Sequence, residues 1–89
     1  MTWRVRVDRA AAKKLKRLDI KYIRQIADQF SRLAINPRPP GSLQLKDSNV
    51  GGWRIRIGKY RVLYTINDDS REVVVYDLGL RDQVYKKRK

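Results

Sequence analysis

The stretch of this chain that decides its fold reads Trp53-Arg54-Ile55-Arg56-Ile57-Gly58-Lys59-Tyr60-Arg61-Val62-Leu63-Tyr64. Apolar and basic residues alternate over 53–57, which is typical of a strand with one buried face and one solvated face. Gly58 and Lys59 then provide a two-residue turn, in which glycine accepts a positive φ. Residues 60–66 supply a second, more apolar strand. The stretch therefore predicts a β-hairpin.

A tight turn also predicts the register of this hairpin. Ile57 would lie opposite Tyr60 and Arg56 opposite Arg61, and residues that lie opposite each other share a face of the sheet. Arg54 lies on that same face, so three guanidinium groups would crowd one end of it. Like charges placed side by side cost stability unless an anion lies among them, and a phosphate fits. An ordinary solvated face and an anion-binding site both stay open at this point.

The N-terminal half of the chain predicts a strand followed by two helices. Residues 3–7 alternate apolar and basic side chains. Asp8 is a good N-cap for a run of strong helix formers over 9–18. Asp19 is expected to cap a second helix over 20–35, where apolar residues recur with the 3.6-residue period. These two acidic residues are therefore interpreted as caps rather than as catalytic acids, and the helices as an antiparallel hairpin.

The remaining segments complete the expected fold. The proline-rich stretch 36–41 ends the second helix, and Leu43 and Leu45 are expected to tuck under the core. Residues 71–78 are nearly continuous in apolar side chains, which favours an internal strand. Residues 80–89 are a basic tail with room for one helical turn.

This order of elements predicts one α+β domain that covers residues 1–89. A strand, two helices and a three-strand meander (β-α-α-β-β-β) place a helical hairpin on one face of a small, mostly antiparallel sheet. The apolar side chains of the strand 53–57 should face the helices. Its two arginines should then lie on the opposite, open face.

Composition limits the classes of function. The 89 residues include 22 Lys and Arg against 9 Asp and Glu, a net charge of +13, and no Cys or His. This charge favours a polyanionic partner, which could be nucleic acid, an acidic protein or an anionic membrane. Nucleic acid is preferred over the interpretation as a merely soluble basic protein. Without Cys and His, we expect no disulfide, no thiol nucleophile, no metal site and no cofactor. No membrane span or export signal is apparent, so the expected compartment is the cytoplasm.

Three segments resemble the RelE/ParE superfamily of bacterial and archaeal toxins. They are the hairpin 53–64, the ending Gly79-Leu80-Arg81-Asp82-Gln83-Val84-Tyr85, and the helical stretch from Ala12 to Leu18. The resemblance covers essentially the whole chain and implies a RelE-like fold. It further implies a toxin of a type II toxin–antitoxin system.

RelE-type members are ribosome-dependent mRNA endonucleases that cut the codon in the A site without a metal. The resemblance implies that the 2′-OH attacks the adjacent phosphate, and it places the family's catalytic positions on Arg54, Arg56, Arg61, Arg81 and Tyr85. It also implies a cognate antitoxin with an acidic toxin-binding segment, and a toxin–antitoxin complex that binds operator DNA through the antitoxin.

Two positions depart from the RelE pattern. Arg56 stands where some members have lysine, and Leu80 stands where many have histidine. Arginine is a poor general base because its pKa exceeds about 12, so Tyr85 becomes the better candidate to take the 2′-OH proton. Two other functions stay open. One is a ParE-like toxin that inhibits DNA gyrase by protein–protein contact, and the other is a non-catalytic RNA-binding module.

Overall fold

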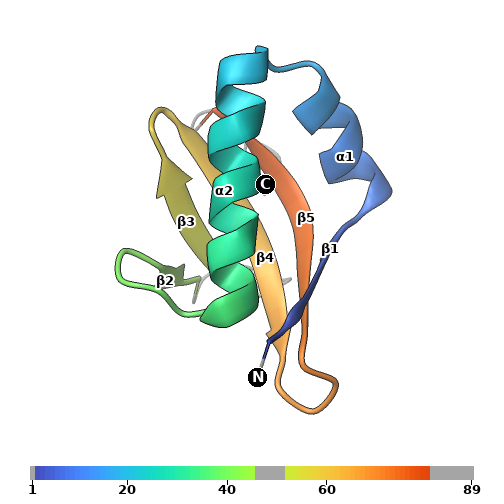
Figure 1. Ribbon diagram of the computed structural model, residues 1–89, viewed down its shortest axis with the longest axis vertical. Helices are drawn as coiled ribbons and strands as arrows, with labels where there is room; N and C mark the ends of the chain where they lie inside the picture. Colours follow the sequence, from blue (N-terminus) through green and yellow to red (C-terminus); the bar gives the residue numbers. More distant parts are fainter. Residues whose placement is uncertain (1, 46–51, 81–89) are drawn as a thin grey trace.

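The computed structural model describes residues 2–45 and 52–80. Figure 1 shows one helix in front of a sheet and a second, shorter helix beside it, with the start of the chain next to the turn between the last two strands. The elements in chain order are β1 (Arg4–Val7), α1 (Arg9–Lys16), α2 (Ile20–Ile35), β2 (Leu43–Gln44), β3 (Trp53–Ile57), β4 (Tyr60–Asn67) and β5 (Glu72–Leu80).

The sheet has five strands in the order β1-β5-β4-β3-β2. β1 runs parallel to β5, and every other pair is antiparallel, so the predicted α+β class with a mostly antiparallel sheet is confirmed. β5 lies between β1 and β4, as its apolar run predicts. The two-residue strand β2 was not predicted. It pairs Leu43 with Arg54 and Gln44 with Trp53 at the edge of the sheet.

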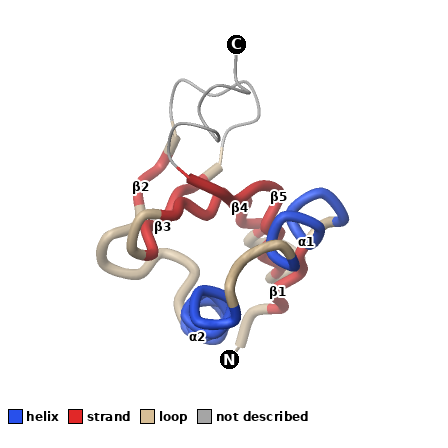
Figure 2. Tube along the Cα trace, turned by 90° about the horizontal axis from the view of Figure 1, so that it is seen from above, coloured by secondary structure: helices blue, strands red, loops and turns tan. Residues whose placement is uncertain are grey.

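Both helices begin directly after the predicted aspartates, which are their N-cap residues. The Asp8 carboxylate accepts a hydrogen bond from the Ala11 amide at 3.0 Å, which satisfies a donor in the first turn of α1. Asp19 precedes α2 but makes no side-chain capping bond, and its carbonyl accepts from the amides of Tyr22 and Ile23 instead. α1 packs against β5, and α2 lies across the hollow of the curved sheet (Figure 2).

The core lies between the helices and the sheet. Ile55 and Ile57 are buried there, with Trp53 packed against them, so the predicted inner face of β3 is confirmed. The other members of this cluster are Ala11, Ile26, Leu33, Val62, Tyr64, Val73, Val75 and Leu78. The expectation that Leu43 tucks under this core is wrong. Leu43 is 52% exposed, because β2 is the edge strand of the sheet, whereas Leu45 is half-buried.

Tyr64 fixes the proline-rich loop to the sheet. Its side chain is fully buried, and its hydroxyl donates to the Pro37 carbonyl at 2.8 Å. Burial raises the pKa of the Tyr64 phenol to about 12, although a hydrogen bond with Ser42 and the charge of Arg38 oppose that rise. The neutral, hydrogen-bonded phenol therefore belongs to the folded state.

A glycine allows β3 to begin close to β4. Gly52 has φ +100, and a Cβ at this position would lie 2.6 Å from the Tyr64 carbonyl oxygen. The pairing of β4 with β5 shifts register at Leu63 and Tyr64, directly beside this contact. Any larger residue at 52 would therefore push β3 away from this irregular part of the sheet. No helix in the described parts of the chain is long and apolar enough to cross a membrane.

Candidate functional site

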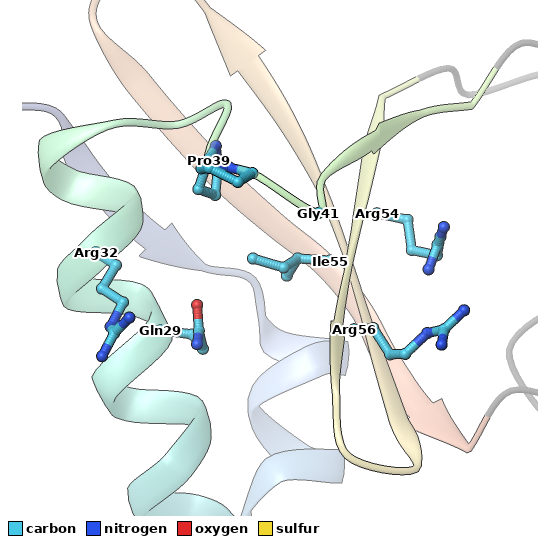
Figure 3. A pocket seen from close by; sticks show the side chains of 8 residues that line it. Gln29, Arg32, Pro39, Gly41, Arg54, Ile55 and Arg56 are labelled. Atoms are coloured by element: carbon cyan, nitrogen blue, oxygen red, sulfur yellow. The ribbon is translucent and has the colours of Figure 1, made fainter.

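The β3–β4 hairpin has the predicted register. Ile57 pairs with Tyr60 and Arg56 with Arg61, and the turn between the strands places Gly58 at φ +59. Figure 3 shows Ile55 pointing toward α2, while Arg54 and Arg56 point to the other side of β3. We call the sheet surface that carries Arg54, Arg56 and Arg61 the arginine face. The structure thus brings three of the five predicted site residues together.

The three arginines differ in exposure. Arg56 is exposed, Arg54 is half-buried and Arg61 is only 8% exposed. Arg61 does not stand on an open surface, as the alternating pattern suggested, because β4 is the central strand and has neighbours on both sides. On its other edge β3 pairs with the two residues of β2.

Two guanidinium nitrogens on the arginine face are buried without a partner. The Nε–H groups of Arg54 and Arg61 are buried and donate no hydrogen bond to any of the described residues. A buried donor that makes no hydrogen bond loses its hydration without compensation. An oxyanion supplies acceptor oxygens and also relieves the repulsion between the guanidinium groups.

No carboxylate in the described part of the chain forms an ion pair with these three arginines. The ion pairs of that part join other residues, namely Arg6 with Glu72, Lys14 with Asp77, Arg32 with Asp28 and Arg38 with Asp68. The positive charge of the arginine face is therefore not neutralised by these acids. The arrangement therefore favours binding of an external anion over a network of ion pairs within the protein.

The two remaining predicted site residues lie outside the described residues. Arg61 pairs with Gly79 of β5, and Tyr60 pairs with Leu80, where β5 ends. The main chain therefore leaves β5 beside the arginine face, one residue after the partner of Arg61. Arg81 and Tyr85 follow that point in the sequence, and their roles stay predictions.

A hollow of about 550 Å³ lies on the other side of β3 from the arginine face. It lies between α2 and β3, and Arg54 and Arg56 border it from the strand although their side chains point away from α2 (Figure 3). Its other lining residues are Gln29, Arg32, Pro39, Pro40, Gly41 and Ile55. Apart from the prolines that end α2, no sequence pattern indicates this hollow, because its shape depends on how the loop folds back over the sheet.

Comparison with known proteins agrees with this geometry. The model of the ParE toxin family of type II toxin–antitoxin systems matches residues 5–85. The chain belongs to the RelE/ParE toxin superfamily. A protein of Methanocaldococcus jannaschii that carries the name toxin RelE1 is 27% identical over 88 residues, which cover 97% of this chain and 98% of that protein.

Solved structures place this toxin among RelE-type relatives. A chain of the archaeal RelE–RelB complex from Pyrococcus horikoshii superposes with a TM-score of 0.80 at 26% identity, covering 91% of this chain and 97% of that one. The toxin–antitoxin complex RelBE2 of Mycobacterium tuberculosis gives 0.79 at 25% identity, covering 91% and 100%. The RelE-like fold is therefore confirmed, and the protein is a RelE-family toxin of a toxin–antitoxin system.

Proposed function

We propose that this toxin is a metal-independent endoribonuclease that cuts mRNA in the ribosomal A site. The observation that supports the proposal most directly is the pair of buried, unpartnered Nε atoms of Arg54 and Arg61 on one face of the hairpin. A phosphodiester in contact with them would supply acceptors for both groups. The RelE-type relatives support the same assignment.

The proposed reaction is attack by the 2′-oxygen of a ribose on the adjacent phosphorus. The 2′-oxygen loses its proton as it forms the new P–O bond, and the 5′-oxygen leaves and takes up a proton. The products are a 2′,3′-cyclic phosphate and a 5′-OH end. Negative charge builds on the phosphoryl oxygens in the transition state, where Arg54 and Arg61 would stabilise it. Arg56, which is exposed, would hold the phosphate from the solvent side.

Arg81 and Tyr85 complete the proposed site. Arg81 would bind the phosphate or the leaving oxygen. Tyr85 would accept the 2′-OH proton, and guanidinium groups next to a phenol would favour its phenolate form. Stacking of the Tyr85 ring on a base is the other role open to it.

We also propose a cytoplasmic antitoxin partner with an acidic toxin-binding segment. The P. horikoshii relative is in complex with RelB, and a +13 domain attracts an acidic chain strongly. Such a segment would cover the arginine face, and the complex would bind operator DNA through the antitoxin. In this arrangement, binding of the antitoxin would inhibit the toxin and neutralise its basic surface at the same time.

Gyrase inhibition is the second candidate, because the matching family model describes ParE toxins. Two assays run side by side separate the candidates: mapping of mRNA 5′ ends in a translation reaction, and supercoiling by DNA gyrase. We expect new 5′ ends within translated codons and normal supercoiling. Intact mRNA with blocked supercoiling would instead assign the chain to the ParE activity.

An Arg54→Gln variant tests the arginine face within the same assay. Cleavage should fall about 10²–10³-fold, the usual cost of losing one preorganised donor. Lys13→Gln is the matched control, because Lys13 is an exposed cation on α1. Equal loss of cleavage in both variants would mean that general charge, rather than the arginine face, carries the activity.

A further inference from the structure

A second group of arginines lies at the other end of the sheet from the β3–β4 turn. The chain start and the β4–β5 turn lie side by side there (Figure 1). A pocket of about 280 Å³ opens between them, and its lining residues are Thr2, Trp3, Arg4, Ser70 and Arg71. Two guanidinium side chains and two hydroxyl side chains therefore belong to residues that border one small hollow.

Arg71 is held in an unusual backbone conformation. Its φ is +55, and it is the one non-glycine residue with positive φ in the described segments. Glycine or asparagine adopts this conformation more easily than arginine. The Arg71 carbonyl accepts a hydrogen bond from the Arg4 amide at 2.9 Å, and its guanidinium lies over the Trp3 ring at 5.3 Å from the centroid. Both contacts fix the position of Arg71 at the pocket.

Two of the three acids near Arg71 in the sequence form ion pairs with other arginines. Asp68 pairs with Arg38 at 3.0 Å, and Glu72 pairs with Arg6 at 3.5 Å. The remaining acid of the turn, Asp69, forms no ion pair with a described residue. Arg4 and Arg71 likewise have no carboxylate partner within the described segments. The pocket therefore has two positive charges that no ion pair balances there.

We propose that this pocket binds a phosphate group of an RNA strand. The planar forks of two arginines match phosphate oxygens, and serine and threonine hydroxyls add neutral donors. The choice of RNA rests on the proposed function. The position of Arg4 also supports RNA as the ligand. Val5, the next residue of β1, packs against the core, so Arg4 lies on the opposite side of the sheet, which is the side of the arginine face.

The two phosphate sites would contact different nucleotides of one strand. Arg4 pairs with Glu72 and Arg61 with Gly79, so seven residue steps of β5 separate the two positions. At a rise of about 3.3 Å per residue they are roughly 23 Å apart along the strand. The pocket is therefore a positioning site, remote from the proposed bond cleavage.

Inorganic phosphate tests the pocket without any assumption about RNA. The indole N–H signals of Trp3 and Trp53 are followed by ¹H–¹⁵N NMR while phosphate replaces chloride at constant ionic strength. The Trp3 signal should shift and saturate in the wild-type protein but not in Arg71→Asn, since asparagine tolerates the positive φ and lacks the guanidinium. An unmoved Trp3 signal, or the same shift in Arg71→Asn, would overturn the site.

A labelled single-stranded oligoribonucleotide then tests the assignment to RNA. Arg71→Asn should weaken binding about tenfold. It should also make binding less salt-dependent, because binding with one phosphate contact fewer releases fewer counterions from the RNA. Arg24→Asn is the control, since Arg24 is exposed on α2, and it should weaken binding much less. Equal losses in both variants, or phosphate binding without any effect on RNA, would overturn the RNA assignment and leave acidic protein segments as the ligand. Failure of mRNA cleavage alone would refute the proposed nuclease but not this pocket.

Discussion

Arg56 lies directly opposite Arg61 across the hairpin that joins β3 to β4. Side chains of directly opposed residues on one face of a sheet lie about 5 Å apart at Cβ, so two like charges are forced together. The neighbouring Ile57–Tyr60 pair and the Gly58 turn fix this register. The fold thus holds a repulsive pair in place, and an anion between the two arginines removes the repulsion.

Replacing Arg61 should separate activity from stability. Arg61→Met keeps an unbranched buried side chain while it removes a charge and an unpartnered Nε. Ribosome-dependent cleavage should fall about 10²–10³-fold, while the melting temperature stays the same or rises. Lys59→Met, at an exposed cation of the same turn, should leave cleavage nearly unchanged. A melting temperature well below wild type for Arg61→Met would show that the guanidinium is structural.

Tyr85 has two possible roles that a pair of variants distinguishes. Tyr85→Phe keeps the ring and removes only the hydroxyl. If the hydroxyl takes the 2′-OH proton, cleavage by this variant should be about 10²–10⁴ times slower with ribosome binding intact. Near-wild-type cleavage by Tyr85→Phe, together with a severe defect in Tyr85→Ala, would assign stacking rather than proton transfer to this residue.

Gly52 and Gly41 offer a matched test of steric contact. Both have positive φ, at +100 and +95, but only at Gly52 would a Cβ meet backbone, at 2.6 Å from the Tyr64 oxygen. Gly41→Ala should cost about 1 kcal/mol in unfolding free energy from backbone strain alone. Gly52→Ala should cost clearly more, about 3 kcal/mol, since β3 must shift. Equal losses in chemical denaturation would show that the close approach to Tyr64 relaxes easily.

Stability at alkaline pH should depend on Tyr64. Its pKa is raised to about 12 by burial, whereas an unfolded tyrosine titrates near 10. The folded state therefore holds this proton more tightly, so the contribution is fully present below about pH 10 and is lost as the pH rises toward 12. Urea denaturation should show a steeper loss of unfolding free energy over this range for wild type than for Tyr64→Phe. If the unfolding free energy of the two proteins fell equally with pH, the raised pKa of Tyr64 would be contradicted.

Tyr64→Phe also removes a buried hydrogen bond. The lost donor to the Pro37 carbonyl should lower the unfolding free energy at neutral pH by about 1 kcal/mol. This offset is measured in the same experiment and does not affect the slopes. A variant as stable as wild type at pH 7 would show that the Pro37 carbonyl finds another donor.

Local chemistry made much of the fold predictable. Gly58 determined the hairpin register, and Asp8 and the helical period determined α1 and α2, because each signal acts within a few residues. β2 was missed since two residues are too short to show a period. The parallel pairing of β1 with β5 was not predictable either, because alternation identifies a strand but not its neighbour.

The sheet face of the candidate site residues was predictable from the sequence, but their burial was not. Alternation correctly put Arg54, Arg56 and Arg61 on one face, yet burial of Arg61 depends on the order of the strands, which local sequence does not encode. The pocket beside Arg71 needs the chain start and a turn about seventy residues later to meet. Arg81 and Tyr85 stay predictions.

The pairing of β1 with β5 affects when this protein becomes folded during its own synthesis. Arg4 of β1 pairs with Glu72 of β5, so β1 cannot join the sheet until β5 has been synthesised. Contacts of such long sequence separation slow folding, since the intervening loop must close before any pairing is gained. A nascent chain that still lacks β5 has no strand to join β1 to β4. We therefore expect the toxin to reach its active shape only after β5 has been translated, when an antitoxin already present can bind it.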